Sequence, residues 1–238
     1  MGASAFPDTR WTMIVQAGRE DDPAADEALA QLCRAYWYPL YAFIRKRGYS
    51  TEEARDLTQD FFAHLLENRR FAAADQERGR FRSFLLKSLQ RFLADSADRS
   101  HAAKRGGGAA TLPLELDGAE NRLAHDLGHD ETPERLFERQ WAEALISRVA
   151  TDLRGAFDRE GRAEQFDRLK QFLPGFGSDT SYAQAAGEMG ATEGALKIAV
   201  HRLRRRYRDF FHAEISRLVA DPQDCDAEIQ YILNVLRS

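Results

Sequence analysis

The chain has 238 residues, of which 43% are hydrophobic and 30% are charged, and its formal net charge is −4. This composition is typical of a soluble globular protein of one or two domains, and no apolar run approaches the roughly 20 residues needed to span a bilayer. The first residues have no apolar signal core, and Cys33 and Cys225 are too few and too far apart for a disulfide framework or a paired-cysteine zinc site. We therefore expect a cytoplasmic protein with no membrane association.

The periodic segments predict helices throughout, and no segment has the alternation that is typical of a strand. In chain order, the first helices are expected at about residues 8–17, 24–47, 50–68 and 80–99. Ser50 and Glu53 form a capping box, which predicts the start of the third of these helices.

Residues 101–131 contain three consecutive glycines and scattered acidic residues without a sustained period, which predicts a flexible acidic linker. Thr132 and Pro133 then have the pattern of an N-cap followed by proline at the first helical position. They predict a long helix to about residue 159, and a shorter helix is expected at about residues 163–173. We expect an all-α protein with two helical domains, at residues 1–100 and 132–216, and a C-terminal extension at residues 217–238.

Charge is segregated along the chain although its total is acidic. Residues 78–105 hold eight basic and two acidic residues, and residues 192–208 hold six basic residues and one acidic residue. Residues 52–67 and 114–138 are acidic instead. Such runs are usually solvated helix faces, but two basic segments separated by an acidic one also suit two surfaces that bind one polyanion.

Residues 181–208 have the pattern of a helix-turn-helix. Ser181 caps a short helix, Gly190 supplies the turn, and Thr192 caps a second helix. A period of 3.6 residues directs one face of that second helix to the core, through Leu196, Val200, Leu203 and Tyr207. The alternative, a basic helix that only packs in a bundle, does not explain both caps and the glycine in register. We expect the outer face to contact DNA bases and phosphates through Thr192, Gly194, Ala195, Lys197, Ile198, His201, Arg202 and Arg205.

Three stretches together resemble bacterial RNA polymerase sigma factors. Region 4, which reads the −35 promoter element, resembles SYAQAAGEMGATEGALKIAVHRLRRRYRDF at residues 181–210. Region 2.2, which binds core polymerase, resembles STEEARDLTQDFFAHLL at residues 50–66. Regions 2.3 and 2.4, which melt and read the −10 element, resemble GRFRSFLLKSLQRFLADSADRSHAAKR at residues 79–105. Because only regions 2 and 4 are present, the chain is similar to the extracytoplasmic-function group over roughly residues 28–215.

The resemblance implies a transcription initiation factor without catalytic activity, metal or cofactor. Its expected partners are core RNA polymerase and promoter DNA, and an anti-sigma protein is a further candidate. The residues implied in binding core polymerase are Asp56, Gln59, Asp60 and Ala63. Those implied in binding and melting the −10 element are Arg80, Phe81, Arg82, Phe84, Lys87 and Arg91. Aromatic rings can stack on unpaired bases. We expect Phe81 to be exposed, with a hydrophobic staple at the start of the helix as the alternative, and a core position is an equal alternative for Phe84.

Two alternatives come from other functional classes. A stand-alone helix-turn-helix regulator with an N-terminal sensing domain would bind its operator tightly without polymerase. A metal-dependent helical enzyme would draw its ligands from histidines and carboxylates at helical spacing. The candidates for that enzyme are Asp56, Asp60 and His64, or His125 and His129. The sequence contains no Walker loop, nucleophile elbow or Rossmann fingerprint, which argues against the commonest enzyme classes.

Overall fold

A computed structural model describes residues 36–68, 81–100, 119–126, 131–177, 180–219 and 221–237. Every regular element within these ranges is helical, which confirms the predicted all-α fold class. The helix predicted at residues 8–17, the first part of the helix predicted at 24–47, and Arg80 and His129 lie outside the described residues.

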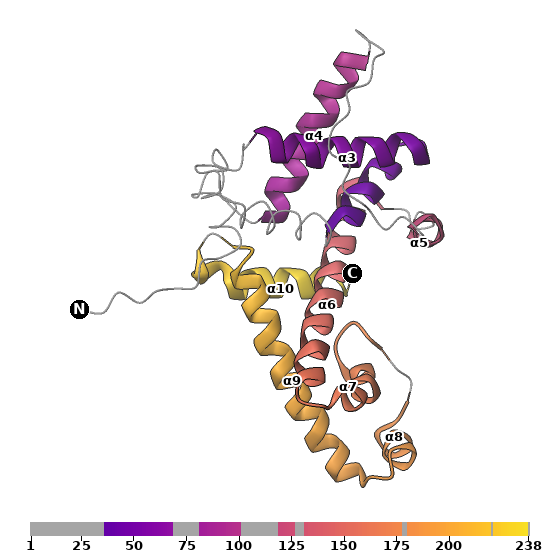
Figure 1. The fold of residues 1–238 in the computed structure, drawn as a ribbon, viewed down its shortest axis with the longest axis vertical. Helices are drawn as coiled ribbons and strands as arrows, with labels where there is room; N and C mark the ends of the chain where they lie inside the picture. The colour runs from indigo at the N-terminus through magenta and orange to yellow at the C-terminus, as the bar shows by residue number, and fades with distance from the viewer. Residues whose placement is uncertain are drawn as a thin grey trace, which may run out of the picture.

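The helices form an elongated arrangement, with two long helices running side by side through its lower half (Figure 1). Residues 36–46 are helical and precede α3 (Thr51–Asn68), α4 (Phe81–Ser100) and α5 (Ala119–Asp126). These elements lie at one end of the molecule. The other elements, in chain order, are α6 (Pro133–Arg159), α7 (Ala163–Leu169), η2 (Lys170–Phe172), α8 (Tyr182–Glu188), α9 (Glu193–Ser216), η3 (Pro222–Asp224) and α10 (Cys225–Val235).

Two helices begin where the capping pattern predicts. At the start of α3, the Ser50 backbone N–H donates to Glu53 Oε2 at 2.9 Å, and the Glu53 N–H donates to Ser50 Oγ at 3.3 Å. At the start of α6, Thr132 Oγ1 accepts from the Arg135 N–H at 3.2 Å, with proline at the next position. These side chains satisfy backbone donors that have no partner within the helix, which is why the helices start there.

The long helix α6 belongs to both ends of the molecule. It has 27 residues and is therefore about 40 Å long. In its first half, Trp141 packs against Tyr36 and Phe81. In its second half, Phe157 packs against Phe166 of α7 at a ring-centroid distance of 5.7 Å. One hydrophobic cluster consequently includes buried residues of α3, α4, α5, α6, α9 and α10. The division into two domains at residues 1–100 and 132–216 stays a prediction.

Part of the predicted linker is a docked helix. In α5, Leu123 is buried and Glu120 pairs with Arg45, with Nη2 to Oε2 at 3.1 Å. Tyr41 donates a hydrogen bond to the same carboxylate. Residues 119–126, within the segment predicted as a linker, are thus helical and in contact with helical residues 36–46. The remaining residues of the predicted linker up to 130 lie outside the described ranges.

Candidate nucleic-acid interface

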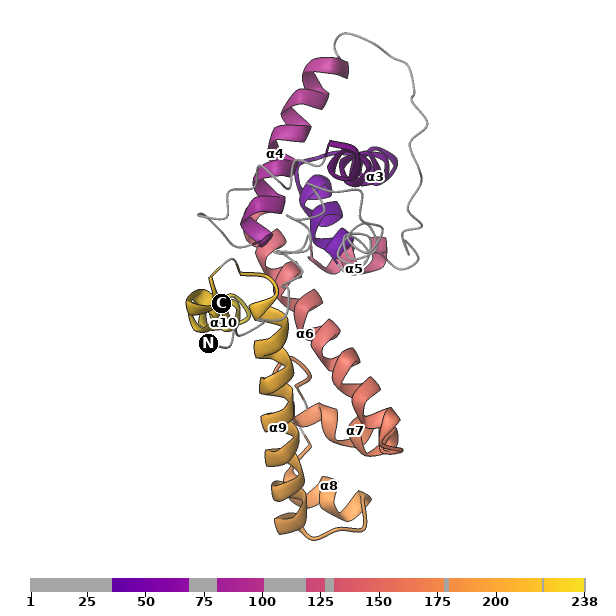
Figure 2. The ribbon, with the colours of Figure 1, turned by 60° about the vertical axis from the view of Figure 1, so that its left-hand side comes forward.

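The helix-turn-helix consists of α8, a turn at residues 189–192, and α9 (Figure 2). Ser181 Oγ accepts from the Gln184 N–H at 3.1 Å, and Thr192 Oγ1 accepts from the Ala195 N–H at 3.2 Å. Gly190 has a φ of +63°, in the left-handed region that glycine adopts without strain. An added Cβ there would meet nothing within 4 Å, so backbone conformation, not space, requires the glycine.

The inner face of α9 agrees with the sequence prediction. Its buried residues include Leu196, Val200, Leu203 and Tyr207. They pack in a core to which α8 contributes Ala185 and Ala186, both buried. The short alanine side chains allow α8 and α9 to approach closely, and this contact fixes which face of α9 points outward.

The outer face of α9 is fully accessible. All eight residues predicted to contact DNA are exposed: Thr192, Gly194, Ala195, Lys197, Ile198, His201, Arg202 and Arg205. Ile198 is 56% exposed, and no other large hydrophobic residue among those described is classed as exposed. A single exposed apolar residue is common on protein surfaces. Here it lies on the same face as small residues and cations, a combination that suits contact with base edges.

The basic residues of α9 divide into two groups. Arg206 forms two hydrogen bonds with Glu160, at 2.7 and 3.0 Å, and Arg204 donates to the Phe172 carbonyl at 3.0 Å. Both therefore help to hold α9 against the rest of the protein. Arg202 and Arg205 form no ion pair with any residue in the described part of the chain, so their charges are available to a ligand.

Lys197 is intermediate between these groups. Its Nζ lies 2.7 Å from Glu193 one turn earlier, and this hydrogen bond raises the pKa of the lysine. Both side chains are more than 45% exposed, so the pair is of the surface type that contributes little to stability. Lys197 can therefore exchange Glu193 for a phosphate at small cost.

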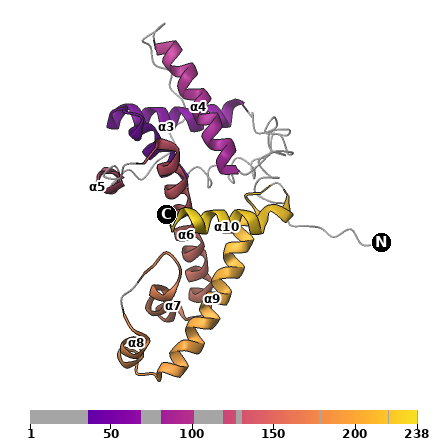
Figure 3. The ribbon, with the colours of Figure 1, turned by 180° about the vertical axis from the view of Figure 1, so that it is seen from behind.

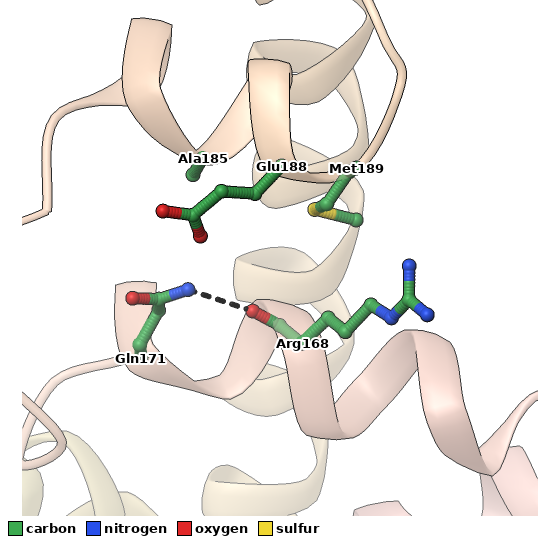
Figure 4. Close-up of a pocket in the computed structure, with 5 residues that line it drawn as sticks. All are labelled: Arg168, Gln171, Ala185, Glu188 and Met189. Atoms are coloured by element: carbon green, nitrogen blue, oxygen red, sulfur yellow. Dashed lines mark hydrogen bonds between the residues drawn. The ribbon is translucent and has the colours of Figure 1, made fainter.

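A depression of about 280 Å³ lies between α7 and α8 (Figure 4). Its lining consists of Arg168, Gln171, Ala185, Glu188 and Met189. Gln171 donates to the backbone carbonyl of Arg168 at 3.0 Å, and Arg168 itself pairs with Glu164. Because two of its polar groups already bond within their own segment, the depression offers no convergent set of free donors.

Some of the residues predicted to bind the −10 element are exposed in the structure and others are buried. Lys87 and Arg91 are exposed on α4, and Phe84 is half-buried against the core. Phe81 is 2% exposed and Arg82 is 6% exposed. The expectation that Phe81 is exposed is therefore wrong for this conformation, because the first turn of α4 packs against Trp141 and α10.

The partners that bury Arg82 were not anticipated from the sequence. Glu228 of α10 binds it from 146 residues away, and Tyr231 covers its guanidinium group. No local sequence pattern predicts that either residue contacts Arg82, because an acid and a tyrosine on a short helix are usually solvated. Only their contacts with Arg82 in the tertiary structure identify them.

On α3, the predicted polymerase-binding residues lie mostly outward. Asp56 and Asp60 are exposed and Gln59 is half-buried. Ala63 is 9% exposed and belongs to the buried side, which corrects its assignment to the outer face. Its neighbour Phe62 is buried too, so both residues lie on the core-facing side of α3.

Of the residues named for the metal-enzyme alternative, Asp56, Asp60 and the His64 side chain are described, and they do not form a chelating group. His64 packs against the Phe92 ring at a centroid distance of 5.5 Å. Among the described residues, no three His, Cys, Asp or Glu side chains are placed to hold one metal ion. The same part of the chain contains no helix long and apolar enough to cross a membrane.

No protein family, curated protein or solved structure was found to match this chain.

Proposed function

We propose that this protein is a transcription initiation factor of the sigma type, which binds core RNA polymerase and directs it to promoters with −10 and −35 elements. The observation that carries the proposal is the outer face of α9, where the exposed Ile198 lies among small and basic residues. The ordered resemblance of α3, α4 and the α8–α9 pair to sigma regions favours this role over a stand-alone regulator. The resemblance further suggests the extracytoplasmic-function group.

In this proposal, α9 lies in the major groove of the −35 element. Gly194 and Ala195 have no bulky side chain, so the helix can come close to base edges there. Ile198 offers an apolar contact to a thymine methyl group, and Arg202 and Arg205 offer donors to guanine or to phosphate. The N-terminus of α9 adds a favourable position for a phosphate.

The N-terminal helices supply the other contacts of the proposal. The acidic residues Asp56 and Asp60 suit a basic surface of the polymerase. Lys87 and Arg91, exposed on α4, suit the phosphates of the −10 element. No catalytic group is required, because polymerase performs the chemistry in a cytoplasmic complex.

The test is a pull-down of purified bacterial core polymerase by this protein, followed by run-off transcription on a library of genomic fragments. We expect stable binding and discrete new transcripts. The matched control is Arg202→Ala combined with Arg205→Ala, which should retain polymerase binding but lose the transcripts. Tight operator binding by the free protein, without polymerase binding, would contradict the proposal and support the stand-alone regulator.

A further inference from the structure

The guanidinium group of Arg82, in the first turn of α4, is bound through each of its three nitrogens by other parts of the chain. Its Nε donates to Glu228 Oε1 at 2.7 Å, and its Nη2 lies 3.5 Å from Glu228 Oε2. Its Nη1 donates to Glu138 Oε1 of α6 at 3.0 Å. The ring of Tyr231 covers one face, with its centroid 3.9 Å from the guanidinium carbon. All three nitrogens therefore have acceptors, and the side chain is only 7% exposed.

The helix α10 keeps this arrangement in place at the start of α4. Seen from behind, α10 lies across the upper end of α9 and below α4 (Figure 3). The Phe81 N–H donates to the Leu218 carbonyl at 3.1 Å, which ties the first residue of α4 to the segment that leads into α10. Ile232 anchors α10 in the core, where it is 1% exposed.

Glu228 binds Arg82 as a phosphate would. The Nε and Nη2 groups of arginine form a planar fork that matches two oxygens of a carboxylate or of a phosphodiester equally well. Burial lowers the pKa of Arg82, but the hydrogen bond and charge of Glu228 outweigh it and raise this pKa. The arginine is thus a permanent cation, at a helix N-terminus that also favours an anion.

The ion pair has the energetics of a replaceable contact. Glu228 and Arg82 are both withdrawn from water, with 4% and 7% of their side chains exposed. Desolvation offsets much of the attraction in such a pair, whereas a buried arginine without an anion is strongly unfavourable. If Glu228 leaves, Glu138 still binds Nη1, but Nε and Nη2 lose their acceptors. A competing anion that replaces Glu228 supplies acceptors to these two groups.

We propose that Glu228 occupies a phosphodiester-binding site of Arg82, so that α10 is an intramolecular cover that leaves when α4 binds the backbone of single-stranded DNA. The inference rests on the proposed function for the identity of the ligand. It assigns a role to the C-terminal extension, which inhibits the −10 surface until the cover opens. It also reconciles the buried position of Arg82 with the DNA contact implied by the sequence.

The test measures binding of a fluorescein-labelled, mixed-sequence 20-nucleotide single-stranded DNA to the full chain by anisotropy at low ionic strength. Glu228→Gln should bind about tenfold more tightly than wild type, the effect of freeing one charge-assisted contact. Adding Arg82→Gln to that variant should abolish the gain. Asp226→Asn is the matched control, because it removes the same charge from an exposed position of α10 and should leave binding within about twofold of wild type.

A second measurement applies even where Glu228→Gln does not fold, as judged by circular dichroism. Hydrogen exchange of backbone amides 225–235 in the wild-type protein should accelerate when saturating single-stranded DNA is added. The inference is overturned if Glu228→Gln binds no more tightly than Asp226→Asn, if the gain persists without Arg82, or if DNA leaves the exchange unchanged. Any of these results with intact polymerase-dependent transcription would remove the cover and leave the sigma role. An Arg82-dependent gain in DNA binding by a protein that does not bind polymerase would support the cover and contradict the sigma role.

Discussion

Trp141 of α6 stacks on Tyr36, with ring centroids 3.9 Å apart and an interplanar angle of 16°. Trp141 is 2% exposed and Tyr36 is fully buried. The pair joins the helix before α3 to the helix that also supports the helix-turn-helix. The stacked rings are therefore the point at which the N-terminal and C-terminal parts of the protein share one core.

Replacing Trp141 with alanine should lower the free energy of unfolding by about 3–5 kcal/mol, because it leaves a cavity between several helices. The shared core predicts that denaturant unfolding, followed by circular dichroism, remains a single transition that moves as a whole. Ile198→Ala serves as the control and should change stability by less than about 0.5 kcal/mol, since that side chain is exposed. Two resolved transitions, only one of them shifted, would mean that the cores are separate.

Arg202→Ala and Arg205→Ala should each weaken promoter binding by roughly 1–3 kcal/mol if the side chain makes a bidentate base contact. The measurement is titration of a promoter fragment with the polymerase complex. Arg217→Ala is the control, because Arg217 carries the same charge at the C-terminal end of α9. With a rise of about 1.5 Å per residue, Arg217 lies at least 18 Å along the helix axis from Arg202 and Arg205. Unchanged promoter binding by both variants, with the control also unchanged, would exclude this face from recognition.

Ile198 should contribute through a thymine methyl group. Once a binding site is selected from random DNA, replacing each thymine with deoxyuridine removes one methyl group at a time. At one position this replacement should weaken wild-type binding by about 1 kcal/mol, the contribution of one buried methyl group, and should have no effect on Ile198→Ala. A uniform response of both proteins at every thymine would show that Ile198 reads no methyl group.

Asp60→Arg should reduce the affinity for core polymerase without unfolding the protein, because it reverses a charge on the exposed face of α3. Affinity is measured by surface plasmon resonance, and folding is checked by thermal denaturation. Asp152→Arg makes the same charge reversal on an exposed position of α6 and should leave polymerase affinity unchanged. Equal affinity of both variants and wild type would remove α3 from the polymerase contact.

The docking of α5 should weaken at alkaline pH. Burial, and then the hydrogen bond with Glu120, raise the pKa of Tyr41 to about 12 from its usual 10.0. The folded protein thus holds this proton more strongly than the unfolded chain. The resulting stabilisation is complete below pH 10 and is lost as the pH rises towards 12. Denaturant unfolding at successive pH values should show a smaller alkaline loss for Tyr41→Phe than for wild type, and identical losses would contradict the assignment.

The amino-acid sequence was sufficient for features that depend on near neighbours. The starts of α3, α6 and α9 follow from side chains that bond to the backbone three residues away. The turn at Gly190 follows because glycine adopts a positive φ without strain, as it does here. The exposed face of α9 follows from the helical period. Such interactions are local, so the sequence pattern is enough to predict them.

Only the tertiary structure decided the surroundings of α4 and the position of the predicted linker. Phe81 and Arg82 have the pattern of a basic, aromatic surface, yet Trp141 of α6 packs on Phe81 and α10 covers Arg82. Glu120 meets Arg45 across 75 residues, and Glu228 meets Arg82 across 146. An ion pair of this kind depends on how distant helices pack, because any exposed acid along the chain is an equally good partner until the fold brings one of them close.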